Sequence, residues 1–279
     1  MTFKGSAAVA GSIGRILMVV TLVSALAACS MFGPTKLKDE EIIPPETLYT
    51  QALADMDALR YQTALDGLKK LQRQHPYSEY NEKAKLMEVY ADYHIGRFDD
   101  AIDAADRYIA LFPGSKEMAY VLFLKGTAYF AQLTDITRDQ KVAQNAIETY
   151  TLLIANYPDS QYAKDAKDKL VIAVDQLAGK EMSVGRYYEG NGQYAAAINR
   201  FRVVVDRYQT SSHIEEALFR LTEANLALGL TNEAQTAAAV LGHNYPSSQW
   251  YKDAYGLLQK LGLEPELNKG SSLATALQG

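Results

Sequence analysis

Apolar residues recur along most of this chain at intervals of three and four, the spacing that places side chains on one face of an α-helix. The pattern runs from Pro45 to about Leu261, and no segment within it alternates convincingly between apolar and polar residues as a half-buried strand would. The chain has 279 residues, of which 48% are hydrophobic and 8 are prolines, so it can bury a large core. The sequence therefore predicts an all-α protein.

A four-residue motif recurs five times within this helical pattern. It consists of an aromatic residue or histidine, a proline, any residue and a serine, and one copy has glutamine in place of the proline. Such regular recurrence predicts a repeat architecture. The copies are His75-Pro76-Tyr77-Ser78, Phe112-Pro113-Gly114-Ser115, Tyr157-Pro158-Asp159-Ser160, Tyr208-Gln209-Thr210-Ser211 and Tyr245-Pro246-Ser247-Ser248.

A fixed helical pattern precedes every copy of the motif. An alanine lies twelve residues before each proline or Gln209, and a large apolar residue follows that alanine by seven. These positions share one helix face, where the small alanine lets a neighbouring helix approach closely. The proline then ends the helix, and the serine can cap the next. The alanines are Ala64, Ala101, Ala146, Ala197 and Ala234, and the apolar residues are Leu71, Tyr108, Leu153, Val204 and Leu241.

This pattern resembles the tetratricopeptide repeat (TPR), a pair of antiparallel helices that stacks into a solenoid. Gly126 and Gly185 also match its first helix, and turns at Gly96, Gly192 and Gly229 separate the two helices of a pair. Successive motifs are 37, 45, 51 and 37 residues apart. We therefore expect a loop in the third unit near 133–140, and in the fourth one long helix from the stretch 161–176 to Glu189. The predicted units span about 46–76, 79–113, 116–158, 161–209 and 212–246, with a closing helix at 248–261 and a disordered tail at 263–279.

The N-terminus has the features of a lipoprotein signal peptide. Lys4 and Arg15 precede an apolar run that ends in Leu26-Ala27-Ala28-Cys29, and that run is too short for a transmembrane helix. The last four residues resemble a bacterial lipobox, which implies removal of residues 1–28 and lipidation of Cys29. Ser30 after the cysteine resembles an outer-membrane lipoprotein, and residues 29–45 read as a tether. An ordinary signal peptide with a chance cysteine is the alternative.

Composition and spacing argue against catalysis and against nucleic-acid binding. The formal charge is −5, and no block of basic residues follows a helix. The chain has one cysteine and four scattered histidines, so the sequence indicates no metal site, no cofactor and no catalytic group. Residues 190–195 match a dinucleotide-binding G-x-G-x-x-A pattern, but a helix and not a strand is expected before them.

The concave face of the first three units is the candidate binding surface. In TPR stacks the first helix of each pair lines this face, and an aromatic groove there suits an extended peptide with apolar and aromatic side chains. The alternative is that several of these rings only pack helix on helix. Alignment on the repeat predicts a groove lined by Tyr49, Leu53, Tyr90, Tyr93, Tyr120, Phe123 and Phe130.

Together, the lipobox, the five repeats and several local strings resemble the TPR lipoprotein family of the outer-membrane β-barrel assembly machine. The strings are Pro44-Pro45-Glu46 with Tyr49, residues 156–162, Glu181-Met182-Ser183-Val184 with Tyr187-Tyr188, and Ala197-Ile198-Asn199-Arg200. The match extends from the lipobox to about Leu261. Another periplasmic TPR lipoprotein, such as a secretin pilotin or a cell-wall synthesis coordinator, would share the anchor and the repeat without the string in the fourth unit.

The resemblance implies a non-catalytic scaffold that is lipid-anchored to the outer membrane and faces the periplasm. Its N-terminal units would receive the C-terminal targeting signals of unfolded outer-membrane β-barrel proteins. Its C-terminal units would hold the periplasmic POTRA region of BamA, with other lipoproteins of the machine as further partners. Arg200 matches a family arginine near the BamA interface, and Glu181, Tyr187 and Tyr188 are weaker candidates for the same interface.

Overall fold

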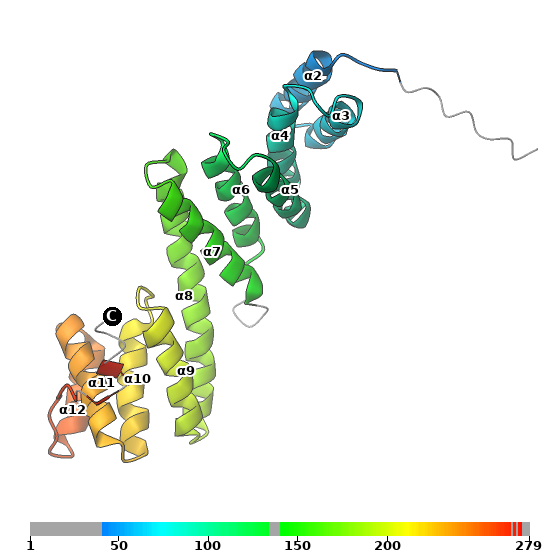
Figure 1. Ribbon diagram of the computed structural model, residues 1–279. Helices are drawn as coiled ribbons and strands as arrows, with labels where there is room; N and C mark the ends of the chain where they lie inside the picture. The colour runs from blue at the N-terminus through cyan, green and yellow to red at the C-terminus, as the bar shows by residue number, and fades with distance from the viewer. Residues whose placement is uncertain (1–40, 134–139, 269, 272, 275–279) are drawn as a thin grey trace, which may run out of the picture. The chain divides into compact units, whose positions relative to one another are not determined.

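The computed structural model describes residues 41–133, 140–268, 270–271 and 273–274, and within them it contains eleven α-helices. The helices follow one another along the chain with short connections (Figure 1). Their bounds are α2 Pro45–Asp57, α3 Tyr61–Gln74, α4 Asn81–His94, α5 Phe98–Leu111, α6 Met118–Ala131, α7 Lys141–Asn156, α8 Gln161–Gly190, α9 Tyr194–Arg207, α10 Ile214–Ala227, α11 Thr231–Asn244 and α12 Gln249–Gln259.

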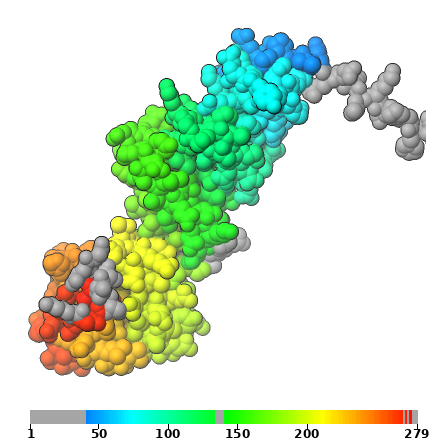
Figure 2. Space-filling view, in the orientation of Figure 1, coloured from blue at the N-terminus to red at the C-terminus, as the bar shows by residue number. Residues whose placement is uncertain are grey.

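The first ten helices form five consecutive pairs, and α12 packs on the last pair. Each helix contacts the one before it along the chain. The first helices of successive pairs also contact one another: α4 contacts α6, and α6 contacts α8. Because every repeat packs mainly against its neighbours, each colour in Figure 2 occupies one region of the surface. This is the TPR-like, all-α solenoid that the periodicity predicts.

The repeat residues form the interior of each pair. The five repeat alanines and the five apolar residues that follow them are all fully buried. Two rings pack where the first helix of the pair has a glycine: Tyr150 lies against Gly126, and Phe201 lies against Gly185. A small residue on one helix therefore accommodates a large one on its partner, which brings the two helices close together.

Turns and caps also follow the sequence pattern. Gly96, Gly192 and Gly229 have φ angles of 78°, 73° and 72°, which an L side chain rarely adopts. The corresponding residue of the first unit is Leu59, at φ 58°. The serine of the motif caps a helix directly at Ser160, whose side chain accepts a hydrogen bond from the backbone N–H of Tyr162 at 3.3 Å.

The enlarged fourth unit contains a single long helix, as predicted. α8 has 30 residues and runs from Gln161 to Gly190 without interruption. Residues 190–195 comprise the last residue of α8, the turn and the start of α9, so a helix precedes the G-x-G-x-x-A pattern. The loop expected near 133–140 falls mainly on residues 134–139, which lie outside the described residues, as does Cys29.

The C-terminal tail differs from the sequence prediction. We expected disorder from residue 263 onward, but the described residues of the tail pack against α11 and the last repeats. Leu273 is 3% exposed and Ala274 is 2% exposed. Gly262 turns the chain back after α12 with a φ of 70°. Isolated side chains of the tail make these contacts. They form no helical repeat in the sequence, so the hydrophobic pattern could not predict the contacts.

Candidate protein-binding surfaces

Two groups of aromatic side chains lie on the N-terminal repeats. In the first, the Tyr90 ring on α4 lies 4.2 Å from the His94 ring and 6.1 Å from that of Tyr61, at the start of α3. The Tyr61 and His94 rings stack at 5.0 Å. In the second, the Tyr162 ring at the start of α8 stacks on two rings of α6, those of Tyr120 and Phe123. We call these six residues the aromatic row.

The two halves of the aromatic row adjoin each other. Tyr90 and Tyr120 both pack, partly buried, on the same core cluster of Leu86, Val89 and Val121. Burial, with smaller contributions from Tyr162 and Tyr90, raises the pKa of Tyr120 to about 12. The row therefore spans units one to four through helices α3, α4, α6 and α8.

Tyr90 and His94 of the aromatic row are uncharged near neutral pH. Burial raises the pKa of the Tyr90 hydroxyl, and burial lowers the pKa of His94 below its usual 6.5. The Tyr90 hydroxyl therefore keeps its proton, and the His94 imidazole stays neutral at pH 7. Such a surface can contact apolar and aromatic side chains with its rings and donate hydrogen bonds to a peptide backbone from its hydroxyls.

All seven residues predicted for the groove are partly buried, but they divide into different environments. Tyr90, Tyr120 and Phe123 belong to the aromatic row. Tyr49 lies beside Tyr80 with 5.1 Å between ring centroids, and Leu53 is on the same helix, α2.

Tyr93 and Phe130 have other neighbours. The Tyr93 ring lies 5.8 Å from that of Phe98 in its own pair and 5.3 Å, edge-on, from that of His94, so Tyr93 borders the aromatic row. The Phe130 ring lies 6.5 Å from that of Tyr150, and the ammonium group of Lys169 lies 5.4 Å from the Phe130 ring. Alignment on first helices missed Tyr61 because this residue opens a second helix. The alignment also missed Tyr162, because this residue lies in the additional N-terminal part of α8 that enlarges unit four.

The residues predicted for the second interface lie where α8 meets α9. The guanidinium Nη1 of Arg200 lies 3.2 Å from Glu181 Oε2, so the two side chains form an ion pair. Glu181 is buried, whereas the Arg200 side chain keeps 45% of its surface exposed. Tyr187, further along α8, is 69% exposed, and the Tyr188 ring beside it packs on the C-terminal core. An exposed guanidinium and an exposed tyrosine are thus available here, while Tyr188 serves packing.

A charged network that the sequence did not reveal lies between α8 and α10. Arg220 Nη1 lies 2.8 Å from Glu223 Oε2 and 3.4 Å from Glu189 Oε2, and its Nε lies 3.4 Å from Glu216. Arg186 pairs with Glu216 at 2.9 Å. Burial raises the pKa of Glu189 to about 7, against the opposing effect of Arg220. Arg186 and Glu216 are 30 residues apart in sequence, so no local spacing predicts that they pair.

Two further features are absent from the described residues. No group of three or more histidine, cysteine, aspartate or glutamate side chains among them could hold a metal ion. None of the helices in this part of the chain combines the length and the apolar composition that a membrane span requires.

Comparison with known proteins decides the family. A family model described as "Outer membrane lipoprotein" (YfiO) matches residues 42–241, which include both surfaces described above. The outer membrane protein assembly factor BamD of Caulobacter vibrioides is 43% identical over 253 residues, covering 88% of this chain and 82% of that protein. The chain belongs to the BamD family. The BamD of Rickettsia prowazekii is 36% identical and covers 87% of this chain and 95% of its own length.

Membership in the BamD family establishes the general role of the chain. It is an assembly factor of the outer membrane and not an enzyme. Among solved structures, a thermophilic TPR protein of Thermus thermophilus covers 77% of this chain and 98% of its own at 15% identity, with a TM-score of 0.35. At that score the superposition is poor, so the fold assignment rests on the helical pairs themselves.

Proposed function

We propose that this BamD-family chain is a lipid-anchored scaffold with two protein-binding surfaces. The aromatic row of the N-terminal repeats receives the C-terminal targeting signal of unfolded outer-membrane β-barrel proteins. The surface around Arg200 and Tyr187 holds the periplasmic POTRA region of BamA, and other lipoproteins of the machine bind elsewhere. The observation that carries this proposal is that the family match spans residues 42–241 and so includes both surfaces.

The chemistry of the aromatic row supports its proposed ligand. A segment rich in apolar and aromatic side chains binds most favourably to a surface of aromatic rings. Tyrosine and phenylalanine provide such rings and lose little side-chain entropy on binding. Neutral hydroxyls at Tyr90 and Tyr120 can donate hydrogen bonds to an extended backbone without the desolvation cost of a charge. No metal or cofactor is involved in this binding.

Removal of two rings tests the row. The double variant Tyr90→Ala and Phe123→Ala truncates one residue in each half of the row, and we expect it to weaken binding of a barrel C-terminal peptide about tenfold or more, because aromatic anchors dominate such interfaces. Fluorescence anisotropy with a labelled peptide measures the affinity, and circular dichroism checks the fold. Tyr77→Ala is the matched control, since that ring is 100% exposed and belongs to neither half. Equal affinity in the double variant and the control would refute the row as the binding surface.

The geometry near Arg200 supports an acidic partner residue at the second surface. Arg200 uses one guanidinium nitrogen on Glu181 and remains 45% exposed, so it has donors left for a carboxylate of BamA. Tyr187 supplies an exposed ring nearby, and tyrosine and arginine are the residue types enriched at binding hot spots.

Charge reversal tests the second surface. Arg200→Glu replaces the donor and places a second carboxylate beside Glu181, so we expect loss of most of the affinity for the purified POTRA region of BamA in a calorimetric titration. Arg207→Glu is the control, because Arg207 is exposed on the same helix, α9, outside the ion pair. An equal loss in both variants would show a general charge effect and would count against a specific role of Arg200.

The lipid anchor is tested separately at Cys29. Mass spectrometry of the mature N-terminus should find residues 1–28 removed and the new terminal cysteine acylated, because stable attachment needs more than one acyl chain. Cys29→Ser should move the chain from the membrane fraction to the soluble periplasm. An unmodified cysteine in the mature wild-type chain would refute lipid anchoring.

A further inference from the structure

The C-terminal tail returns along α11 and is held there by side chains of that helix. Gln235 Nε2 donates a hydrogen bond to the backbone oxygen of Glu264 at 2.7 Å. The backbone N–H of Asn268 donates to Thr236 Oγ1 at 3.2 Å. Further on, the Ser271 hydroxyl donates to Glu233 Oε2 at 2.5 Å. These three contacts come from little more than one turn of α11, and Tyr255 of α12 also hydrogen-bonds the Glu264 side chain.

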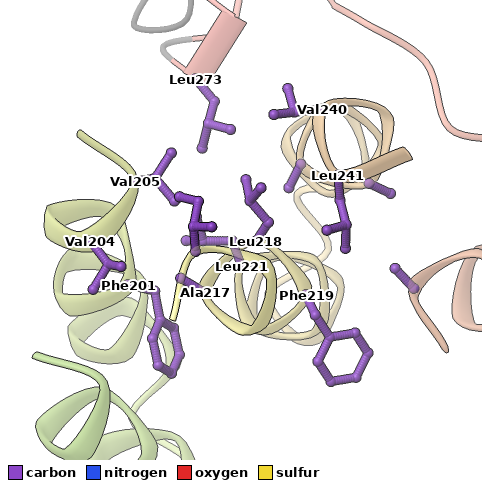
Figure 3. Packing of buried hydrophobic residues seen from close by; sticks show 14 of the residues in the cluster. Phe201, Val204, Val205, Ala217, Leu218, Phe219, Leu221, Val240, Leu241 and Leu273 are labelled. Atoms are coloured by element: carbon purple, nitrogen blue, oxygen red, sulfur yellow. The ribbon is translucent and has the colours of Figure 1, made fainter. Parts of the chain in front are cut away.

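The tail then inserts one leucine into an apolar groove. In Figure 3, Leu273 points between Val205 of α9 and Val240 of α11, above Leu218 of α10. Leu273 is 3% exposed and Ala274 is 2% exposed, whereas Leu267 earlier in the tail is 47% exposed. The groove therefore makes most of its apolar contact with a leucine and the small residue after it.

The groove is larger than its occupant. A cavity of about 870 Å³ extends beside the tail, with walls that include Ile214, Ala239 and Tyr245. Gln209 and Thr210 also border it, and they belong to the one motif copy that lacks its proline. The irregular copy of the repeat thus lies at the edge of an apolar groove with room for more than one side chain.

We propose that this groove between α9 and α11 is a docking site for an extended partner segment that carries a leucine followed by a small residue. The tail is its built-in competitor. Side-chain donors and acceptors on α11 face the tail backbone and the Ser271 hydroxyl, and an apolar slot takes one side chain, which is how extended peptides are recognised. The groove shares no residue with either surface of the proposed function, so this proposal and the proposed function can be tested independently.

The tail is suited to displacement. Leu273 anchors the far end of the tail, and a short tether gives that end an effective concentration of about millimolar, so a partner segment that also fills the neighbouring cavity can outcompete it. Displacement also frees the carboxylate of Glu233 and the hydroxyl of Thr236 for a new backbone or hydroxyl group.

A peptide copy of the tail is the probe for this groove. A labelled peptide of residues 266–274 is titrated by fluorescence anisotropy into the full chain and into a chain truncated after Pro265, which lacks every residue of the peptide. We expect saturable binding to the truncated chain and at least about tenfold weaker binding to the full chain, because the attached tail competes. The same peptide with Leu273→Asp should not bind the truncated chain. Full-length Leu273→Asp is a second receptor that keeps the chain length, and it should gain binding of the wild-type peptide.

The outcomes separate clearly. The proposal is supported if the peptide binds only to receptors whose groove is empty and only when the peptide carries Leu273. Equal binding to the full and truncated chains overturns it, because the peptide would then occupy another site. Absence of binding to both the truncated chain and full-length Leu273→Asp, with an unchanged circular dichroism spectrum for either, also overturns it. Glu233→Gln in the truncated chain should weaken binding several-fold through loss of the charged acceptor for Ser271.

Discussion

At the scale of single residues, contacts between glycine and aromatic rings determine how closely the helices of a pair approach. A Cβ atom built on Gly126 would lie 2.5 Å from Cε1 of Tyr150, a ring that is itself fully buried. The Tyr150 hydroxyl donates a hydrogen bond to Thr127 at 3.4 Å, which restricts how far the ring can move. The repeat pattern predicted that Gly126 lies in the first helix of its pair. Only the structure shows that the Tyr150 ring packs against it.

Gly126→Ala should therefore destabilise the chain by about 1–3 kcal/mol, the usual cost of overpacking a close contact. Chemical unfolding by urea, followed by circular dichroism, measures the change. Gly67→Ala is the control: a Cβ there would meet Ala52 at an ordinary 3.8 Å, so this change should be neutral or stabilise α3 by up to about 1 kcal/mol. Equal destabilisation by both changes would show that contact with Tyr150 is not the cause.

Glu189 makes stability depend on pH. Its pKa is about 7 in the folded chain against 4.5 for the free group, because burial disfavours the carboxylate. The folded state thus binds more protons between these values, and stability from this group is lost as pH rises from about 4.5 to about 7. The loss is on the order of 2–3 kcal/mol.

The variant Glu189→Gln removes this titration, so its free energy of unfolding should fall less than that of the wild type between pH 5 and pH 8. Urea unfolding at the two pH values gives the difference. Glu223→Gln also removes a carboxylate from Arg220 and should retain most of the wild-type fall. Identical pH dependence in the wild type and Glu189→Gln would contradict the assignment.

At the scale of elements, the turn between the two helices of a pair lies five residues before the repeat alanine in four of the five pairs. Gly96, Gly192 and Gly229 occupy that place with positive φ, and in the first unit the place belongs to Leu59 at φ 58°. Leu59 is also exposed, so little burial offsets the unfavourable backbone angle. The repeat pattern predicted the three glycine turns, and the same spacing marks Leu59 as the exception.

We expect Leu59→Gly to stabilise the chain by about 0.5–1 kcal/mol, since relief of the left-handed backbone exceeds the extra entropy that glycine loses on folding. A rise in Tm checks this. Gly96→Ala, the reverse change at the equivalent position, should lower stability by about 1 kcal/mol. A lower Tm for Leu59→Gly would show that the side chain of Leu59 contributes more than its backbone angle costs.

At the scale of the whole molecule, the sequence predicted what depends on local spacing. The repeat alanines, the motif prolines and the glycine turns place every helix pair, and the surplus residues of unit four predict the long α8. Contacts between distant segments were not predictable in this way. The Arg220 network and the docking of Leu273 join residues on separate helices, and no periodicity encodes them. Phe123 and Phe130 show the same limit. Both lie on α6, but their spacing does not predict that Phe123 stacks on Tyr162 while Phe130 lies beside Tyr150.

The central claim is that the chain is a scaffold that binds BamA at the outer membrane. The most direct measurement is affinity capture of the tagged, full-length chain from detergent-solubilised envelopes of the bacterium that makes it, with identification of the captured proteins by mass spectrometry. We expect BamA to be recovered with the wild-type chain in comparable amount and to be largely lost with Arg200→Glu. Recovery of the wild-type chain in folded form without BamA would contradict this claim.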